Sequence, residues 1–267
     1  MTNKSKGHNC FYVEAKPLED GLAEAIDDGH VDGLAEVIDD GQVVQGIADF
    51  LSEEFNWDKD LAMNIWGFGP ETTGPNLLVD ACKGEIGYSN EINQSLVAGF
   101  KEASNKGCLT EEEMRGICFN LLEDVVHCSS IDLRKSICYS QFTATPRLLE
   151  PFYLFEIQVP ERQLGGVCTV VEERGGGVFL EMHIPGHPYY KVKGYIAINN
   201  SFGFSRVLKA STDDIALLQC LFDHWDIIEA DPLDPSSPAG ILVGEIRERK
   251  GLGMMNLLRD FLDNQGF

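Results

Sequence analysis

Positive charge is scarce in this sequence of 267 residues. Lysine and arginine together number 21, against 43 aspartate and glutamate residues, so the formal net charge is -22. Proteins that bind nucleic acid on their own draw much of their affinity from lysine and arginine side chains that neutralise phosphates. The composition therefore argues against independent, tight nucleic-acid binding. It favours an acidic surface that is either solvated or covered by a basic protein partner.

Long hydrophobic runs are also missing. No apolar stretch reaches the roughly 18 residues that a membrane span needs, and the first residues, MTNKSKGHNC, lack the apolar centre of a signal peptide. The hydrophobic content of 43% is nevertheless ordinary for a chain that buries a core. We expect a globular cytoplasmic protein of one or two domains, with no membrane partner.

The motifs of catalysis and cofactor binding are incomplete. The eight cysteines contain no C-x-x-C pair, which indicates buried thiols rather than zinc ligands or a disulfide framework. Gly69 and Gly74 have the G-x-x-x-x-G spacing, but Pro75 and Asn76 stand where a phosphate-binding loop needs lysine and a hydroxyl residue. No G-x-S-x-G motif is present, and His224 is expected to be a hydrogen-bonded structural histidine. We predict no catalytic residue, metal or cofactor.

One segment of the sequence is duplicated in tandem. Asp20–Val31 is followed at once by the near copy Asp32–Val43, and the two differ only at Ala25/Val37 and His30/Gln42. Two such short copies cannot build a solenoid, which needs longer units and at least three of them. Because the segment is rich in glycine and in acidic pairs, it is expected to be a polar lead-in to the following helix rather than part of the core.

Periodicity predicts an α/β unit in the first half of the chain. Strands followed by crossover helices are typical of that class. The expected elements are a strand over 11–16, a helix over 43–55, a helix capped by Asp58 that continues through Trp66, a strand over 77–80, a helix over 89–104, a strand over 115–127 and a helix over 132–145.

Pro146 and Pro151 mark a boundary, after which the order β-α-β-β-α-β indicates a ferredoxin-like domain. Its expected elements are strands over 152–159, 177–184, 189–198 and 215–223, with helices over 160–173 and 201–210. Beyond Pro232 the sequence predicts a crossing segment and an amphipathic helix that contains Met255, Leu258, Phe261 and Leu262. The basic run RERKGL is expected to be a solvated charge cluster at the start of a helix.

Several phrases occur together in a characteristic order: WGFGPETTGPNLLVD, ATPRLLEPFYLFEIQVPE, INNSFGFSRVL, CLFDHWDIIEADPLDPSS and RERKGL. In this combination the chain resembles the C-terminal half of eukaryotic translation elongation factor 2. The resemblance implies an α+β or α/β architecture: an S5-like α/β fourth domain over 1–149, completed by 231–267, and a ferredoxin-like fifth domain over 150–230. It implies a role in ribosomal translocation, without the GTPase domain of that family and therefore without enzymatic activity.

The sequence departs from the family in three places. The family has DGLAE-x-ID once, so the second copy is an insertion. The family also has a loop I-H-R-G-G-G-Q whose histidine becomes diphthamide; here the chain runs directly on after His127, so we expect no such modification and no toxin-catalysed ADP-ribosylation. Finally, Asp213 and Asp214 replace the two glycines of a T-G-G-Q-A segment near the ribosome-facing side.

The resemblance leaves a small set of candidate ribosome-facing residues, namely Lys4, Lys6, His8, Asn9, His127, Arg134 and Lys135. Against their few positive charges stands the net charge of -22, so ribosome binding is expected to be weak if it is retained. The alternative is a non-catalytic acidic module that binds a basic protein and has lost its RNA-facing chemistry. Ribosome co-sedimentation separates the two.

Overall fold

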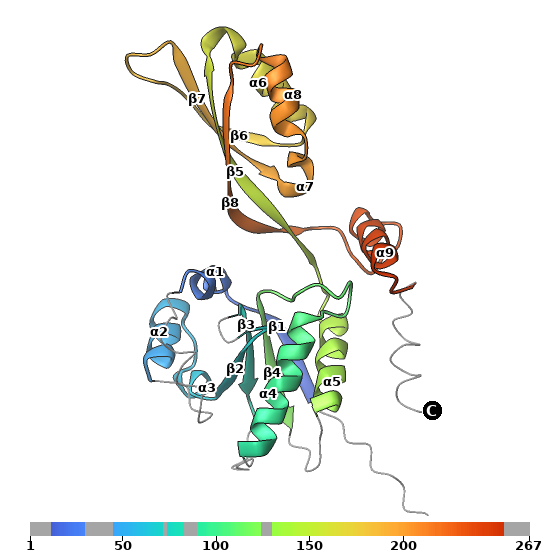
Figure 1. Cartoon of the computed structure of the whole chain (residues 1–267). Helices are drawn as coiled ribbons and strands as arrows, with labels where there is room; N and C mark the ends of the chain where they lie inside the picture. The colour runs from blue at the N-terminus through green and yellow to red at the C-terminus, as the bar shows by residue number, and fades with distance from the viewer. Residues whose placement is uncertain (1–11, 30–44, 72–73, 83–89, 124–129, 254–267) are drawn as a thin grey trace, which may run out of the picture. The chain divides into compact units, whose positions relative to one another are not determined.

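A computed structural model describes residues 12–29, 45–71, 74–82, 90–123 and 130–253 of the chain. The chain divides into two compact units: unit 1 comprises residues 1–146 and 233–267, and unit 2 comprises residues 147–232 (Figure 1). Each unit contains a four-stranded sheet with helices packed on it, an α+β architecture.

The sheet of unit 1 has the strand order β1-β4-β3-β2. Strands β3 and β4 run parallel, and the crossover helix α4 connects them; the other two strand pairs are antiparallel. The elements of unit 1 are β1 (Tyr12–Pro17), α1 (Leu22–Asp27), α2 (Gln45–Phe55), α3 (Lys59–Ala62), β2 (Ile65–Gly69), β3 (Asn76–Asp80), α4 (Asn90–Asn105), β4 (Ile117–Glu123), α5 (Ser130–Thr143) and α9 (Pro238–Lys250).

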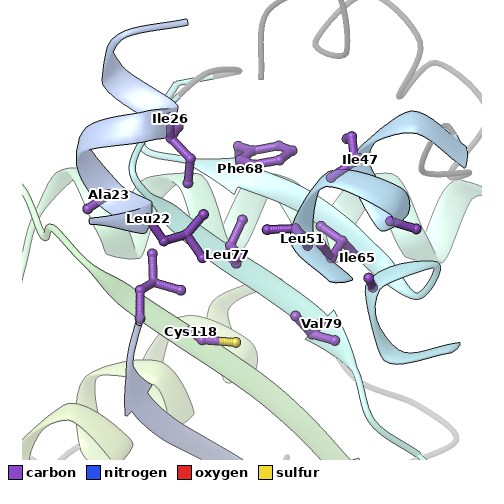
Figure 2. Packing of buried hydrophobic residues seen from close by; sticks show 13 residues of the cluster. Leu22, Ala23, Ile26, Ile47, Leu51, Ile65, Phe68, Leu77, Val79 and Cys118 are labelled. Atoms are coloured by element: carbon purple, nitrogen blue, oxygen red, sulfur yellow. The ribbon is translucent and has the colours of Figure 1, made fainter. Parts of the chain in front are cut away.

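Both faces of this sheet are covered. Leu77 and Val79 of β3 point to a cluster formed with α1, α2 and α3, whereas Leu78 points to a second cluster formed with α4 and α5. Figure 2 shows the first cluster, in which α1 and α2 lie over β2, β3 and β4. A strand buried on both faces has a continuous apolar run instead of an alternating one, which explains why NLLVD contains three consecutive aliphatic residues.

The first copy of the duplicated segment belongs to the core, so the expectation of a polar lead-in was wrong for it. Leu22, Ala23 and Ile26 are buried in the first cluster, and they lie on one face of α1. Gly21 begins the helix in the left-handed conformation with φ 83°, which glycine adopts without strain. The acidic residues dominate the composition, but the apolar i, i+1, i+4 spacing determines which face is buried. The second copy, Asp32–Val43, lies outside the described residues. Helix α2, which follows it in the sequence, is described.

Deleting Asp32–Val43 is expected to leave the secondary structure and the melting temperature nearly unchanged. The first copy supplies the helix that fills the cluster, and the shortened chain still reaches α2 through His30 and Val31. Closing a shorter loop changes the free energy of unfolding by only about 0.6 kcal/mol for each halving of length. Circular dichroism and differential scanning calorimetry of the deletion variant measure both quantities; a loss of several degrees would show that the second copy contributes contacts of its own.

The helix predicted from Asp58 through Trp66 is wrong in its second half. Asp58 does cap a helix, because its carboxylate accepts hydrogen bonds from the backbone N–H of Asp60 at 2.8 Å and of Leu61 at 3.4 Å. That helix, α3, ends at Ala62, and Ile65 and Trp66 begin strand β2, which pairs with β3. Short apolar runs fit either period, and pairing with a buried strand decides the outcome here.

Unit 2 is ferredoxin-like, as the sequence predicts. The strand order β6-β7-β5-β8 consists of antiparallel pairs only, and α6 and α8 pack on one face of the sheet through Phe155, Val170, Phe204 and their neighbours (Figure 1). The elements are β5 (Leu148–Pro160), a 3-10 turn (Glu161–Gln163), α6 (Leu164–Glu173), β6 (Gly177–His183), β7 (Tyr189–Ala197), α7 (Ile198–Ser201), α8 (Phe204–Ser211) and β8 (Leu217–Ile228).

Strands β5 and β8 are longer than predicted. Before Phe152, residues 148–151 of β5 pair with β8 alone, since the β7 ladder begins at the pair Phe152/Ala197. Pro151 is therefore tolerated within the strand, because on one side it has no neighbouring strand that would need its missing N–H. FDHW consequently lies inside β8 and not at the end of the strand.

Helix α9 was missed by the sequence analysis, which expected a helix only after Gly253, outside the described residues. Its signals are nevertheless present: Ser237 accepts a hydrogen bond from the Gly240 N–H at 2.9 Å, Pro238 takes the first turn, and Gly251 ends the helix with φ 69°. This combination of caps is typical of a helix.

Candidate functional site

The residues predicted to face the ribosome are not brought together in the described part of the chain. Lys4, Lys6, His8, Asn9 and His127 lie outside the described residues. Arg134 and Lys135 lie on α5, where the Arg134 guanidinium donates a hydrogen bond to the Glu102 carboxylate of α4 at 2.8 Å. This surface therefore stays a prediction from the resemblance.

The Gly/Pro motif after β2 is a close-packed turn. A Cβ atom on Gly74 would lie 2.2 Å from the carbonyl oxygen of Gly69, and one on Gly69 would lie 2.4 Å from the Ser104 hydroxyl. Both glycines are thus required by the approach of backbone and side chains rather than by a ligand. The expected rigid turn is what the described residues of this motif form.

Asn76, at the end of this motif, is fully buried and satisfies three backbone groups. Its side-chain amide donates to the carbonyl oxygens of Gly69 at 2.9 Å and Met114 at 2.7 Å, and its oxygen accepts from the Ile117 N–H at 3.2 Å. These bonds join the turn after β2 to the start of β4. In the sequence, Asn76 stands out only as a mismatch to a phosphate-binding loop, so this role was not predicted.

The basic run RERKGL lies at the end of α9, so its placement at the start of a helix was wrong. The Arg247 guanidinium donates to the carbonyl oxygens of Leu109, Leu252 and Gly253 at 2.7, 3.3 and 3.1 Å. The Lys250 ammonium donates to the Glu111 carbonyl at 2.9 Å and pairs with the Glu112 carboxylate at 2.6 Å. These two cations hold the C-terminal helix on the loop between α4 and β4, so their role here is structural.

Cys108 and Cys118 are structural thiols. Burial raises the pKa of Cys118 to about 12, and burial together with a hydrogen bond to Cys138 raises the pKa of Cys108. Thiolates are the nucleophiles and metal ligands, so these groups are poorly suited to either task at neutral pH. In the described part of the chain no three histidine, cysteine or acidic side chains gather as they would around a metal ion.

The face of the unit 2 sheet opposite α6 and α8 carries an aromatic band. The ring of His224 stacks on Phe152 at 5.4 Å between centroids and meets Tyr195 edge to face at 5.0 Å, and Tyr195 in turn contacts Phe179 at 4.9 Å. Asp223 contacts the His224 Nδ1 at 2.7 Å. His224 is thus a packed and hydrogen-bonded histidine, in keeping with the sequence expectation.

Aliphatic side chains extend the same open face. Leu221 and Tyr195 lie opposite Leu154, and Leu217 and Lys191 lie opposite Gln158, so alternation along the strands places them on the aromatic side of the sheet. Leu221 is 68% exposed and Leu217 63%. Glu156, Lys193 and Gln219 separate Leu217 from Leu221 on this face, so the apolar patch consists of Leu221 and the aromatic band; an exposed apolar patch is typical of an interaction site. We call it the open face of unit 2.

A pair of carboxylates borders the open face. Glu150 and Asp226 lie opposite each other in the β5/β8 ladder, one alternation step beyond Phe152 and His224. Partial burial and the neighbouring Asp226 charge raise the pKa of Glu150. The lysines of this face are already engaged, since Lys191 and Lys193 pair with Glu156 at 2.8 and 3.3 Å. A ligand of this face therefore meets an apolar centre and a negative edge.

Replacing Glu150 with glutamine tests this carboxylate pair. A carboxyl group with a raised pKa in the folded state stabilises the fold fully below its unfolded pKa, and that stability is lost as the pH rises through the folded value. The Glu150→Gln variant should therefore melt slightly above the wild type at pH 7 and together with it near pH 3. Thermal melts at the two pH values measure this; an equal shift at both would point to packing instead of charge.

Comparison with known families assigns both units. Residues 36–135 match the model of elongation factor G, domain IV, and residues 147–235 match the model of the elongation factor G C-terminus. The chain belongs to the elongation factor G/elongation factor 2 family. Together the two ranges cover more than half of the chain, in the order that the resemblance implies. Within the described residues, no helix is long and apolar enough to cross a membrane.

Proposed function

We propose that the chain is an elongation factor 2-like translation protein that engages the ribosome through its domain IV-like and C-terminal units and has no GTPase activity of its own. The observation that supports this is the presence of two consecutive domains of one translocation factor family, 36–135 and 147–235. Neither match is to a nucleotide-binding domain. The expected place of action is the cytosol.

Binding to the ribosome should be weak. The net charge of -22 opposes the approach to ribosomal RNA, and the Asp213 and Asp214 side chains, 77% exposed in the latter case, add two carboxylates to the turn before β8. Co-sedimentation of the purified chain with ribosomes at physiological salt tests the proposal. Some binding above a serum albumin control supports it, and none at any salt concentration contradicts it.

The open face of unit 2 favours a second candidate function, a module that binds a basic protein segment. Its apolar centre fits aliphatic side chains, and the neighbouring carboxylates of Glu150 and Asp226 fit an arginine or lysine. RNA bases also stack on aromatic sheets, but the acidic edge and the engaged lysines disfavour phosphate here.

Synthetic peptides that combine leucine with arginine test this second function by fluorescence anisotropy. Binding should be lost in Leu221→Glu and weakened in Asp226→Asn. Binding that survives Leu221→Glu would exclude the open face as the site.

A further inference from the structure

The first copy of the duplicated segment docks as helix α1. In the first copy, Leu22, Ala23 and Ile26 fill the cluster shown in Figure 2. Outside the cluster, the Arg115 guanidinium pairs with the carboxylates of Glu24, at 3.1 Å, and of Asp27. The helix is therefore held by three apolar side chains and two charges, all of which belong to the repeated segment.

Every one of these groups recurs in the second copy. Gly21, Leu22, Ala23, Glu24, Ile26 and Asp27 correspond, in order, to Gly33, Leu34, Ala35, Glu36, Ile38 and Asp39. The two differences fall at Ala25/Val37, a half-buried position, and at His30/Gln42, beyond the end of α1. The second copy thus carries the whole set of side chains that docks the first.

The structure and the family match differ in which copy they include. The structure docks the first copy as α1. The match to elongation factor G, domain IV, instead begins at Glu36 and runs from the second copy into α2, so it leaves the first copy outside the matched range. Because the matched range also leaves out β1, which belongs to the sheet of unit 1, its start does not decide which copy occupies the site. The second copy is a competitor because it repeats the side chains that dock the first.

We propose that the two copies compete for this site, so that the protein exchanges between one form with Leu22–Asp27 docked and another with residues 34–39 docked. In the first form residues 28–44 connect the helix to α2. In the second form residues 19–33 connect β1 to the helix, and the path to α2 is short. The free energy of closing a loop varies only with the logarithm of its length, so neither connection decides the exchange.

A contact outside the repeat distinguishes the two forms. The Trp57 indole donates a hydrogen bond to the Glu19 carboxylate at 2.5 Å, and Val31 stands at the corresponding position before the second copy. This bond is exposed and modest, so it biases the exchange toward the first copy without suppressing the second.

Charge substitutions in the two copies test the exchange. Leu22→Asp and Leu34→Asp should each lower the melting temperature by less than about 3 °C, because the intact copy takes the site, whereas the double variant should lose about 10 °C or more, as the loss of a buried leucine predicts. The matched controls Asp28→Ala, at an exposed position, and Asp40→Ala, its counterpart in the second copy, should combine additively. If one single variant shows the full loss of melting temperature and the other shows none, only one copy occupies the site and the proposal is overturned. A double variant no worse than the singles would also overturn it.

Hydrogen exchange tests the wild-type protein directly, without depending on a variant that unfolds. The Ala25 and Asp28 amides donate to the carbonyls of Gly21 and Glu24 at 2.9 and 2.8 Å, and they lose these bonds whenever the first copy is displaced. The Leu34→Asp variant should therefore slow exchange in the first copy at least tenfold, by removing its competitor. A hydrogen-exchange rate in the first copy that Leu34→Asp leaves unchanged would contradict the competition. So would amides of the first copy that are, in the wild type, as strongly protected as those of β3.

Discussion

The Asn76→Asp variant is expected to lose about 3 kcal/mol or more of its free energy of unfolding. Asparagine at this position donates to two carbonyl oxygens and accepts one N–H, all in the interior of unit 1. Aspartate has the same shape, but its carboxylate would place an acceptor against the oxygens of Gly69 and Met114 and would bury an unpaired charge. Leaving buried groups unsatisfied costs about 1–3 kcal/mol each, and more for charged groups.

Urea denaturation followed by circular dichroism measures this loss. Asn64→Asp, at an exposed position of the same unit, is the matched control and should change the free energy of unfolding by less than about 0.5 kcal/mol. The Asn76→Asp deficit should shrink at low pH, where the carboxyl group is protonated and can donate one hydrogen bond. Equal stabilities of the two variants at pH 7 would show that the Asn76 bonds contribute little.

The double variant Asp213→Gly/Asp214→Gly is expected to stabilise unit 2 by about 1–2 kcal/mol. Both aspartates adopt left-handed conformations, with φ 53° and 61°, and a residue with a Cβ is strained there by up to about 1–2 kcal/mol. The contacts that the variant loses are exposed: the Asp213 carboxylate accepts from Gln163 at 2.7 Å, and Asp214 pairs with Lys209 at 3.4 Å. Such surface contacts contribute little.

A second double variant, Asp213→Asn/Asp214→Asn, separates strain from charge. Asparagine removes both charges but keeps the Cβ, so it should yield much less stabilisation than glycine if backbone strain is the cause. Thermal melts of the three proteins decide the matter. Equal gains from both variants would assign the effect to charge repulsion, and a loss in the glycine variant would show that the side-chain contacts outweigh the strain.

The ferredoxin-like unit was predictable because its pattern is repeated. Strands of alternating type bounded by Gly and Pro, with two helices at regular intervals, admit few arrangements, so the order of the elements was predicted correctly although β5 and β8 extend further than expected. The repeat was misread in its first copy because acidic residues and glycines dominate its composition. Leu22 and Ile26 lie four residues apart, a spacing that predicts a buried helical face when it is weighed above composition.

The surfaces were harder to predict than the fold. The sequence LLQCLF has apolar residues at successive positions of β8, which indicates two apolar faces, yet only one is covered by helices of unit 2. Asn76 escaped notice because its partners Met114 and Ile117 are distant in the sequence. Alternation reveals that a residue is buried, whereas a hydrogen-bond network across elements depends on tertiary pairing that one sequence does not display.

The salt dependence of ribosome co-sedimentation tests the central claim, that this chain keeps two translocation-factor domains but opposes RNA by its charge. The account predicts low occupancy that stays constant or rises slightly as the monovalent salt increases from about 50 to 300 mM, since screening weakens repulsion. Asp213→Gly/Asp214→Gly should raise that occupancy at low salt. Tight binding at low salt that falls steeply as salt rises, and that is abolished by replacing Lys4 and Lys6 with glutamate, would contradict the account.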